Sequence, residues 1–210
     1  MYYLEIFLTR LLVLLFANYQ LRGKENVPRS GPLLVVANHL SMADPPVLGI
    51  SLGRRAIFMA KEELFRNRFT GFFVRQFGAF PVYRERPSPD AIRQASRVLK
   101  QGKVLVMFPE GKRSKAGGLD SGFFGSALIA YHNQVPILPV GITGTEKIRG
   151  LWWIWRRPGL TFTIGQPFQL PVGQNALTRE QLALYTDVIM RKIAELLPEK
   201  YQGNYCGADV

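Results

Sequence analysis

Six short apolar runs, each four to six residues long, constrain the fold of this chain more than any other feature of its sequence. They are rich in Val, Ile, Leu and Phe, which is typical of strands that are buried on both faces. Helical patterns lie between them, and this alternation predicts an α/β fold, a single domain with a central mixed, largely parallel sheet flanked by helices. The runs are Leu33–Ala37, Ala56–Ala60, Ala79–Val82, Val104–Phe108, Ile137–Ile142 and Thr161–Ile164.

Two of the predicted helices have clear signals at their ends. Ser88-Pro89-Asp90 opens the first with a cap and a proline at the first helical position, and Gly102 ends it. In the second, Thr178 and Gln181 have the spacing of a capping box, and Pro198 stops the apolar stripe that follows. We interpret both apolar faces as core packing.

The charge of the chain narrows the class of partner. With 27 Lys and Arg against 15 Asp and Glu in 210 residues, the formal charge is +12. Such an excess points to a polyanion, which could be nucleic acid, an anionic membrane or a phosphorylated substrate. Cys206 is the only cysteine, so an internal disulfide is excluded and nothing requires an oxidising compartment.

The N-terminal segment is apolar but does not have the pattern of a membrane span. Glu5 and Arg10 interrupt it, and the longest unbroken apolar run, Leu11–Ala17, is far shorter than the roughly 20 residues that a span needs. It also lacks the early basic region and cleavage site of a signal peptide. We expect residues 1–24 to form an interfacial membrane helix and residues 25–210 to form the domain, although a helix docked on the domain is the alternative.

A second segment has the composition of a membrane interface. Residues 151–157 contain all three tryptophans of the chain beside Arg156 and Arg157. Indole rings favour the headgroup region and arginines bind lipid phosphates, so we favour membrane contact over an aromatic flap that closes the core. With the N-terminal helix, this predicts a monotopic protein at the cytoplasmic face of a membrane.

His39 and Asp44 follow directly after the first apolar run and are five positions apart. An imidazole accepts a proton near neutral pH when a partner on its other nitrogen fixes its tautomer, and Asp44 is placed to be that partner. The alternative is structural, because Pro45 and Pro46 also make Asp44 a plausible cap of a short helix through about Gly49.

Cationic side chains occur at the ends of three other predicted strands. Lys61 and Arg84 follow two of them, and the turn Pro109–Lys115 follows a third with Glu110, Gly111 and Arg113. Lysine and arginine suit a phosphate, and glycine lets a ligand approach the backbone, although a solvated basic loop is the alternative. Because functional groups collect where strand ends meet their loops, we expect these residues to converge with His39 on one edge of the sheet.

Four sequence blocks, taken together, resemble those of the glycerolipid acyltransferases, the family of 1-acyl-sn-glycerol-3-phosphate acyltransferase. The resemblance extends over roughly residues 33–141, and its first and third blocks are the specific ones. The blocks are Asn38-His39-x4-Asp44, Gly78-x-x-Pro81-x-x-Arg84, Phe108-Pro109-Glu110-Gly111-x-Arg113-Ser114 and Val135-Pro136-Ile137-Leu138-Pro139-Val140.

The resemblance implies that residues 25–210 form an acyltransferase domain, which moves a fatty acyl group from acyl-CoA or acyl carrier protein to the free sn-2 hydroxyl of 1-acyl-sn-glycerol-3-phosphate and gives phosphatidic acid in phospholipid biosynthesis. His39 would be the general base and Asp44 its partner. Arg84 and Arg113 would hold the acceptor phosphate, with Lys61 as a further phosphate ligand, while Glu110 and Gly111 would shape that pocket. The thioester is a co-substrate, so no cofactor or metal is expected.

One position departs from the family pattern, and several other functions remain open. Lys112 stands where the family commonly has threonine, which leaves the acceptor headgroup undecided. Glycerol-3-phosphate or another lysolipid could be the acceptor. A thioesterase would use the same base on water, whereas a noncatalytic basic protein would bind RNA or anionic membranes without needing His39. The other histidine, His132, is expected on a helix surface.

Overall fold

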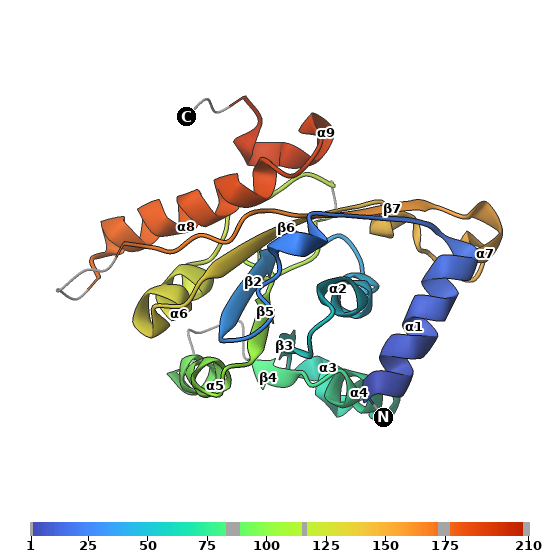
Figure 1. Ribbon diagram of the computed structural model, residues 1–210, viewed down its shortest axis with the longest axis horizontal. Helices are drawn as coiled ribbons and strands as arrows, with labels where there is room; N and C mark the ends of the chain where they lie inside the picture. The colour runs from blue at the N-terminus through green and yellow to red at the C-terminus, as the bar shows by residue number, and fades with distance from the viewer. Residues whose placement is uncertain (1, 83–88, 115–116, 172–176, 208–210) are drawn as a thin grey trace.

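A computed structural model describes residues 2–82, 89–114, 117–171 and 177–207. Its centre is a seven-stranded sheet in the order β1-β7-β6-β2-β5-β3-β4, with helices on both faces (Figure 1). The six predicted strands are all present, with ends that shift by at most two residues. The strands are β1 (Asn18–Arg22), β2 (Leu33–Ala37), β3 (Ala56–Lys61), β4 (Phe80–Val82), β5 (Val104–Met107), β6 (Ile137–Thr143) and β7 (Gly159–Ile164).

The direction of the strands sets where the loops meet. β2 pairs in parallel with both β5 and β6, and β3 pairs in parallel with β5 and β4. β7 runs antiparallel to β6, and β1 pairs in parallel with β7. The sheet is therefore mixed and mostly parallel, as predicted, and the carboxyl ends of β4, β3, β5, β2 and β6 lie along one edge.

Successive residues of β2 contribute to two separate cores, because side chains alternate across a strand. Leu34 and Val36 pack with apolar residues of α5 (Pro89–Lys100), α6 (Gly125–Asn133) and α8 (Arg179–Ala194). Leu33 and Val35 pack on the other face with residues of α1 (Tyr2–Phe16) and α2 (Asp44–Leu52). All five residues of β2 are buried, as expected for a strand covered on both faces.

Short helices complete the chain. They are α3 (Glu63–Arg66), α4 (Arg68–Gln76), α7 (Trp153–Arg156) and α9 (Glu199–Gln202), with 3₁₀ turns at Lys24–Asn26, Thr145–Lys147 and Gly203–Tyr205. The predicted capping box of α8 is confirmed: the Gln181 N–H donates to Thr178 Oγ1, and the Thr178 N–H donates to the Gln181 side chain.

The N-terminal segment differs from the prediction. The helix ends at Phe16 and does not continue to residue 24, because residues 18–22 pair with β7 as the edge strand β1. Tyr19 and Leu21 pack against the core from this strand, which explains why the segment leaves the helix. Among the described residues, no helix has both the length and the apolar character needed to cross a membrane.

Candidate active site

His39 lies just beyond the carboxyl end of β2 and is paired with Asp44. Its Nδ1 is 2.7 Å from Asp44 Oδ2, and the same oxygen accepts the N–H groups of Leu40 at 2.6 Å and Ser41 at 2.7 Å. Asp44 is fully buried and is the first residue of α2, but no side-chain hydrogen bond caps that helix. The carboxylate therefore orients the imidazole instead of capping α2.

The pairing fixes the state of the imidazole. A carboxylate oxygen surrounded by donors accepts, so the proton lies on His39 Nδ1 and leaves Nε2 as the acceptor. The ring also stacks on Phe108, with centroids 4.2 Å apart and planes inclined by 19°. Hydrogen bonding and stacking together hold Nε2 in one direction, which a general base requires.

The loop that carries His39, here called the base loop (residues 38–44), is tied to the sheet by Asn38. The Asn38 side chain donates to the Ile142 carbonyl at 2.8 Å and accepts the Ile142 N–H at 2.7 Å. Its amide thus imitates one more step of the pairing between β2 and β6. Asn38 is buried, so this contact sets where the base loop leaves the sheet.

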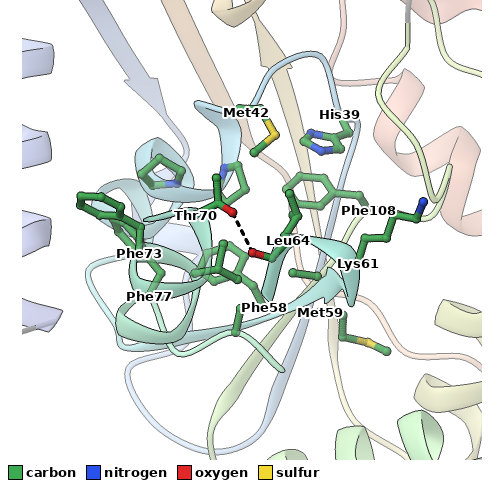
Figure 2. Close-up of a pocket in the computed structure, with 15 residues that line it drawn as sticks. His39, Met42, Phe58, Met59, Lys61, Leu64, Thr70, Phe73, Phe77 and Phe108 are labelled. Carbon is green, nitrogen blue, oxygen red and sulfur yellow. Dashed lines mark hydrogen bonds between the residues drawn. The ribbon is translucent and has the colours of Figure 1, made fainter. Parts of the chain in front are cut away.

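An apolar cavity of about 280 Å³ opens beside His39. Figure 2 shows the imidazole over the Phe108 ring, with Phe73 and Phe77 in the opposite part of the cavity wall. The wall comes from the start of α2, from β3 and from α3 and α4. Its largest apolar side chains, apart from Phe108, are Met42, Phe58, Met59, Leu64, Phe73 and Phe77. Such a cavity suits a hydrocarbon chain held next to the base.

The described cations at this edge of the sheet differ in their exposure and in their ion-pair partners. Lys61 ends β3, lines the cavity and is 2.7 Å from Glu63 in a half-exposed ion pair. Arg113 is exposed and makes no hydrogen bond or ion pair with another described residue. Lys112 is 2.6 Å from Asp120. Arg84 follows β4 but lies outside the described residues.

Glu110 and Gly111 belong to the turn after β5, which we call the cation loop (residues 108–114 and 117–120). The Glu110 carboxylate is buried and accepts the His39 N–H at 3.1 Å, and burial raises its pKa from 4.5 to about 7. Gly111 has φ of +63°, and a Cβ there would lie 2.9 Å from the Phe123 ring. Glycine therefore suits the left-handed conformation of this turn, and a side chain there would also have to displace the exposed Phe123 ring.

Several residues of the site were not singled out as functional from the sequence. The base loop depends on Asn38, which belongs to the first block but received no role. Phe73 lies in α4 and Phe77 directly follows it, and the only signal in the sequence was the apolar run Phe72-Phe73-Val74. His132 lies on the surface of α6, as predicted. Among the described residues, no cluster of His, Cys, Asp or Glu has the arrangement of a metal site.

Comparison with known proteins adds the family context. A family model described as "Acyltransferase" matches residues 18–143. The chain is 30% identical to the 1-acyl-sn-glycerol-3-phosphate acyltransferase of Bacillus subtilis over 83% of this chain and 85% of that protein. It is 41% identical to the Streptococcus pneumoniae protein of the same name, over 56% of this chain and 44% of the relative.

A solved structure has the same fold. It is the 1-acyl-sn-glycerophosphate acyltransferase PlsC from Thermotoga maritima, with a TM-score of 0.66 and 29% sequence identity. The match covers 91% of this chain and 78% of that chain. The base loop and the cation loop both fall inside the span that the family model matches.

Proposed function

Because the chain belongs to the acyltransferase family, we propose that it transfers a fatty acyl group to the sn-2 hydroxyl of 1-acyl-sn-glycerol-3-phosphate and so makes phosphatidic acid. It is an O-acyltransferase, and the relatives' names support this acceptor. The donor in this proposal is an acyl thioester, either acyl-CoA or acyl carrier protein. The single observation that carries the proposal is the pair of His39 and Asp44 beside an apolar cavity.

In the proposed reaction, His39 Nε2 takes the proton of the acceptor hydroxyl while its oxygen attacks the thioester carbonyl. Asp44 holds the Nδ1–H and stabilises the imidazolium that forms. When the tetrahedral intermediate collapses, the carbon–sulfur bond breaks and the imidazolium returns its proton to the leaving thiolate. The ester forms and the free base is regenerated without a covalent enzyme intermediate.

In this proposal the cations bind the phosphate of the acceptor, and the cavity binds a fatty chain. Arg113 is exposed and free to bind the acceptor phosphate, and Lys61 lies at the cavity wall on the same edge of the sheet. Arg84 has the same role in the proposal by its place in the second block. The cavity beside His39 would hold a fatty chain, because its wall is almost wholly apolar.

We also propose that the protein works on a membrane surface, at the cytoplasmic face. Phe16 of α1 contacts the Trp153 ring of α7, so the two helices adjoin on one side of the molecule (Figure 1). Their outward side chains are 44% to 82% exposed, and the exposed Arg156 and Arg157 follow them. An apolar face beside cations suits anionic lipid headgroups. The exposed apolar residues are Tyr3, Leu4, Phe7, Leu8, Leu11, Leu12, Leu14, Leu15, Leu151, Trp152 and Trp155.

The test of the activity is thiol release from palmitoyl-CoA by the purified protein in detergent, with and without lysophosphatidic acid. Release is expected to depend on the acceptor and to fall by about 10²-fold to 10⁴-fold in His39→Ala. His132→Ala is the matched control and should behave as wild type, because that histidine lies on the surface of α6. Release without acceptor would identify a thioesterase, and full activity in His39→Ala would remove the base from the proposal.

The test of membrane binding is co-sedimentation with phosphatidylglycerol vesicles. The double change Trp152→Ala and Trp155→Ala should lower the bound fraction without changing activity on a detergent-solubilised acceptor, because the two rings are 75% and 82% exposed. Unchanged binding would show that α7 is not part of the docking face.

A further inference from the structure

The carboxylate of Glu110 joins two loops through their backbones. Its Oε1 accepts the N–H of His39 and its Oε2 accepts the N–H of Asp120, each at 3.1 Å. Glu110 is 1% exposed, so the anion is surrounded by protein and both of its oxygens are engaged. Because both oxygens already accept backbone N–H groups and the side chain is buried, Glu110 has no free group to offer to an acceptor phosphate.

The peptide of His39 is held on both sides by the cation loop. Its N–H donates to Glu110, and its carbonyl accepts the Ser114 N–H at 2.7 Å. Phe108, the first residue of the same loop, stacks under the imidazole. Three contacts therefore place the base relative to a loop 71 residues away from it in sequence.

The far side of the cation loop is anchored by the C-terminal segment. The Leu119 N–H donates to the Tyr201 carbonyl at 3.0 Å, and the Asn204 N–H donates to the Leu119 carbonyl at 3.1 Å. A Cβ on Gly203, whose φ is +52°, would lie 2.2 Å from the Leu119 carbonyl oxygen. The N–H of Asp120, which follows Leu119, is thus presented to Glu110 from a fixed piece of backbone.

We propose that Glu110 is a positioning residue, which fixes His39 by tying its backbone to the cation loop and does not contact the acceptor phosphate. The inference rests on the proposed function, because it concerns the placement of the base in acyl transfer. In this inference the exposed Arg113 of the same loop binds the phosphate. Glu110 holds the cation loop in a fixed position relative to His39. When a general base is displaced from its productive position, the rate of the catalysed reaction falls steeply.

The first experiment measures kcat and KM for lysophosphatidic acid in Glu110→Gln. An amide keeps one acceptor but turns its nitrogen toward a backbone N–H, so one of the two contacts is lost. We expect kcat to fall by about 10-fold to 100-fold while KM for the acceptor stays within about 3-fold. A rise in KM with kcat retained would make Glu110 an acceptor contact and overturn the inference, as would kinetics equal to wild type.

A matched control separates this effect from the loss of any partly buried carboxylate. Glu5→Gln removes a partly buried carboxylate of α1, whose pKa is also raised by burial and which belongs to neither loop. Its kcat should remain that of wild type. If wild type itself shows no acceptor-dependent thiol release, the proposed function fails; if wild type is active and Glu110→Gln equals it, only the positioning role fails.

The second experiment compares the pH profile of kcat in wild type and in Glu110→Gln, with circular dichroism to confirm that the variant folds. Glu110 faces the charged groups of Asp120, Lys112 and Tyr205. Protonation of Glu110 would turn one of its oxygens into a donor that faces a backbone N–H. If Glu110 must be unprotonated to hold both N–H groups, wild-type kcat should show an acid-side ionisation near its pKa of about 7 that is absent from Glu110→Gln. An acid side that is the same in both proteins would overturn the inference.

Discussion

The base loop and the cation loop both carry a buried carboxylate, but the two carboxylates are used differently. Asp44 directs one oxygen at three donors that lie within five residues of it, so the base loop is closed on itself. Glu110 divides its oxygens between residues 71 and 10 positions away. Asp44 orients the His39 ring from within its own loop, and Glu110 relates the backbone of that loop to the cation loop.

The two loops also differ in the exposure of their candidate functional side chains. His39 is only 8% exposed, whereas the Lys112 side chain is 64% exposed and Arg113 faces solvent. A buried base keeps a fixed direction and a dry surrounding, and exposed cations can meet a charged headgroup before it is desolvated. The proposed proton transfer and the proposed phosphate recognition are thus assigned to side chains of different exposure, on two loops that are joined through the backbone contacts of Glu110 and Ser114.

The largest expected effect tests the closed base loop. Asp44→Asn should lower kcat by about 10²-fold to 10⁴-fold, because the imidazole loses the charge that fixes its tautomer and stabilises the imidazolium. The measurement is acceptor-dependent thiol release, with circular dichroism to confirm folding. A loss of less than about threefold would show that His39 does not depend on Asp44, and the contrast between the loops would disappear.

The next effect tests the burial of Glu110 through the free energy of unfolding. Since its pKa is raised from 4.5 to about 7, the folded protein holds a proton that the unfolded chain has released between these values. Stability from this group is therefore fully present below pH 4.5 and is lost as the pH rises toward 7.

The glutamine in Glu110→Gln does not titrate. Subtracting the free energy of unfolding of this variant from that of wild type therefore removes the pH dependence of all other groups. The stability of wild type minus that of Glu110→Gln should fall by about 3 kcal/mol over this interval, measured by urea unfolding at a series of pH values. A difference that does not change with pH would mean that the carboxylate stays hydrated in the folded protein.

A smaller effect tests the exposed part of the cation loop. Arg113→Ala should raise KM for lysophosphatidic acid by about 10-fold and leave kcat nearly unchanged, because a charge-assisted contact to phosphate contributes about 1.5 to 3 kcal/mol, part of which water replaces. The assay is the same thiol release at varied acceptor concentration. A fall in kcat with KM unchanged would place Arg113 with the base instead of with the phosphate.

The smallest effect concerns Lys112. Its ion pair with Asp120 is exposed on both sides, 64% and 44%, so it contributes little to stability. Lys112→Thr, which introduces the residue common in the family pattern, should leave the urea midpoint of unfolding unchanged within error. Asp120→Asn is the matching change on the other partner, and it keeps the backbone N–H that Glu110 accepts. A clear fall of the midpoint in either variant would show that the pair organises the loop.

Several parts of the fold could be predicted because their signals are local. The apolar runs located β2 to β7, and the capping box located the start of α8, since each pattern reports contacts between residues a few positions apart. The edge strand β1 was missed. Residues 18–22 become a strand only because β7, about 140 residues later in the chain, offers a free edge.

In the candidate site, too, the features with local signals could be predicted, and those that depend on distant contacts could not. His39 and Asp44 were paired from the sequence alone because five residues of backbone hold them within reach, and the turn chemistry of Pro109 to Gly111 marked the second loop. The resemblance to a family supplied the roles of the cations, which spacing does not contain. Only the tertiary structure placed Phe108 under the imidazole, Asn38 on Ile142 and Glu110 on the backbone of His39.

The sequence by itself therefore determined six of the seven strands, the helices with clear end signals, and the pairing of Asp44 with His39. The tertiary structure decided which loops meet, because neighbours in the sheet are set by strand order, and β2 lies beside β5 and β6 although long stretches of chain separate them. A hydrogen bond across such a distance depends on the packing of the whole sheet, and no short pattern of residues encodes it.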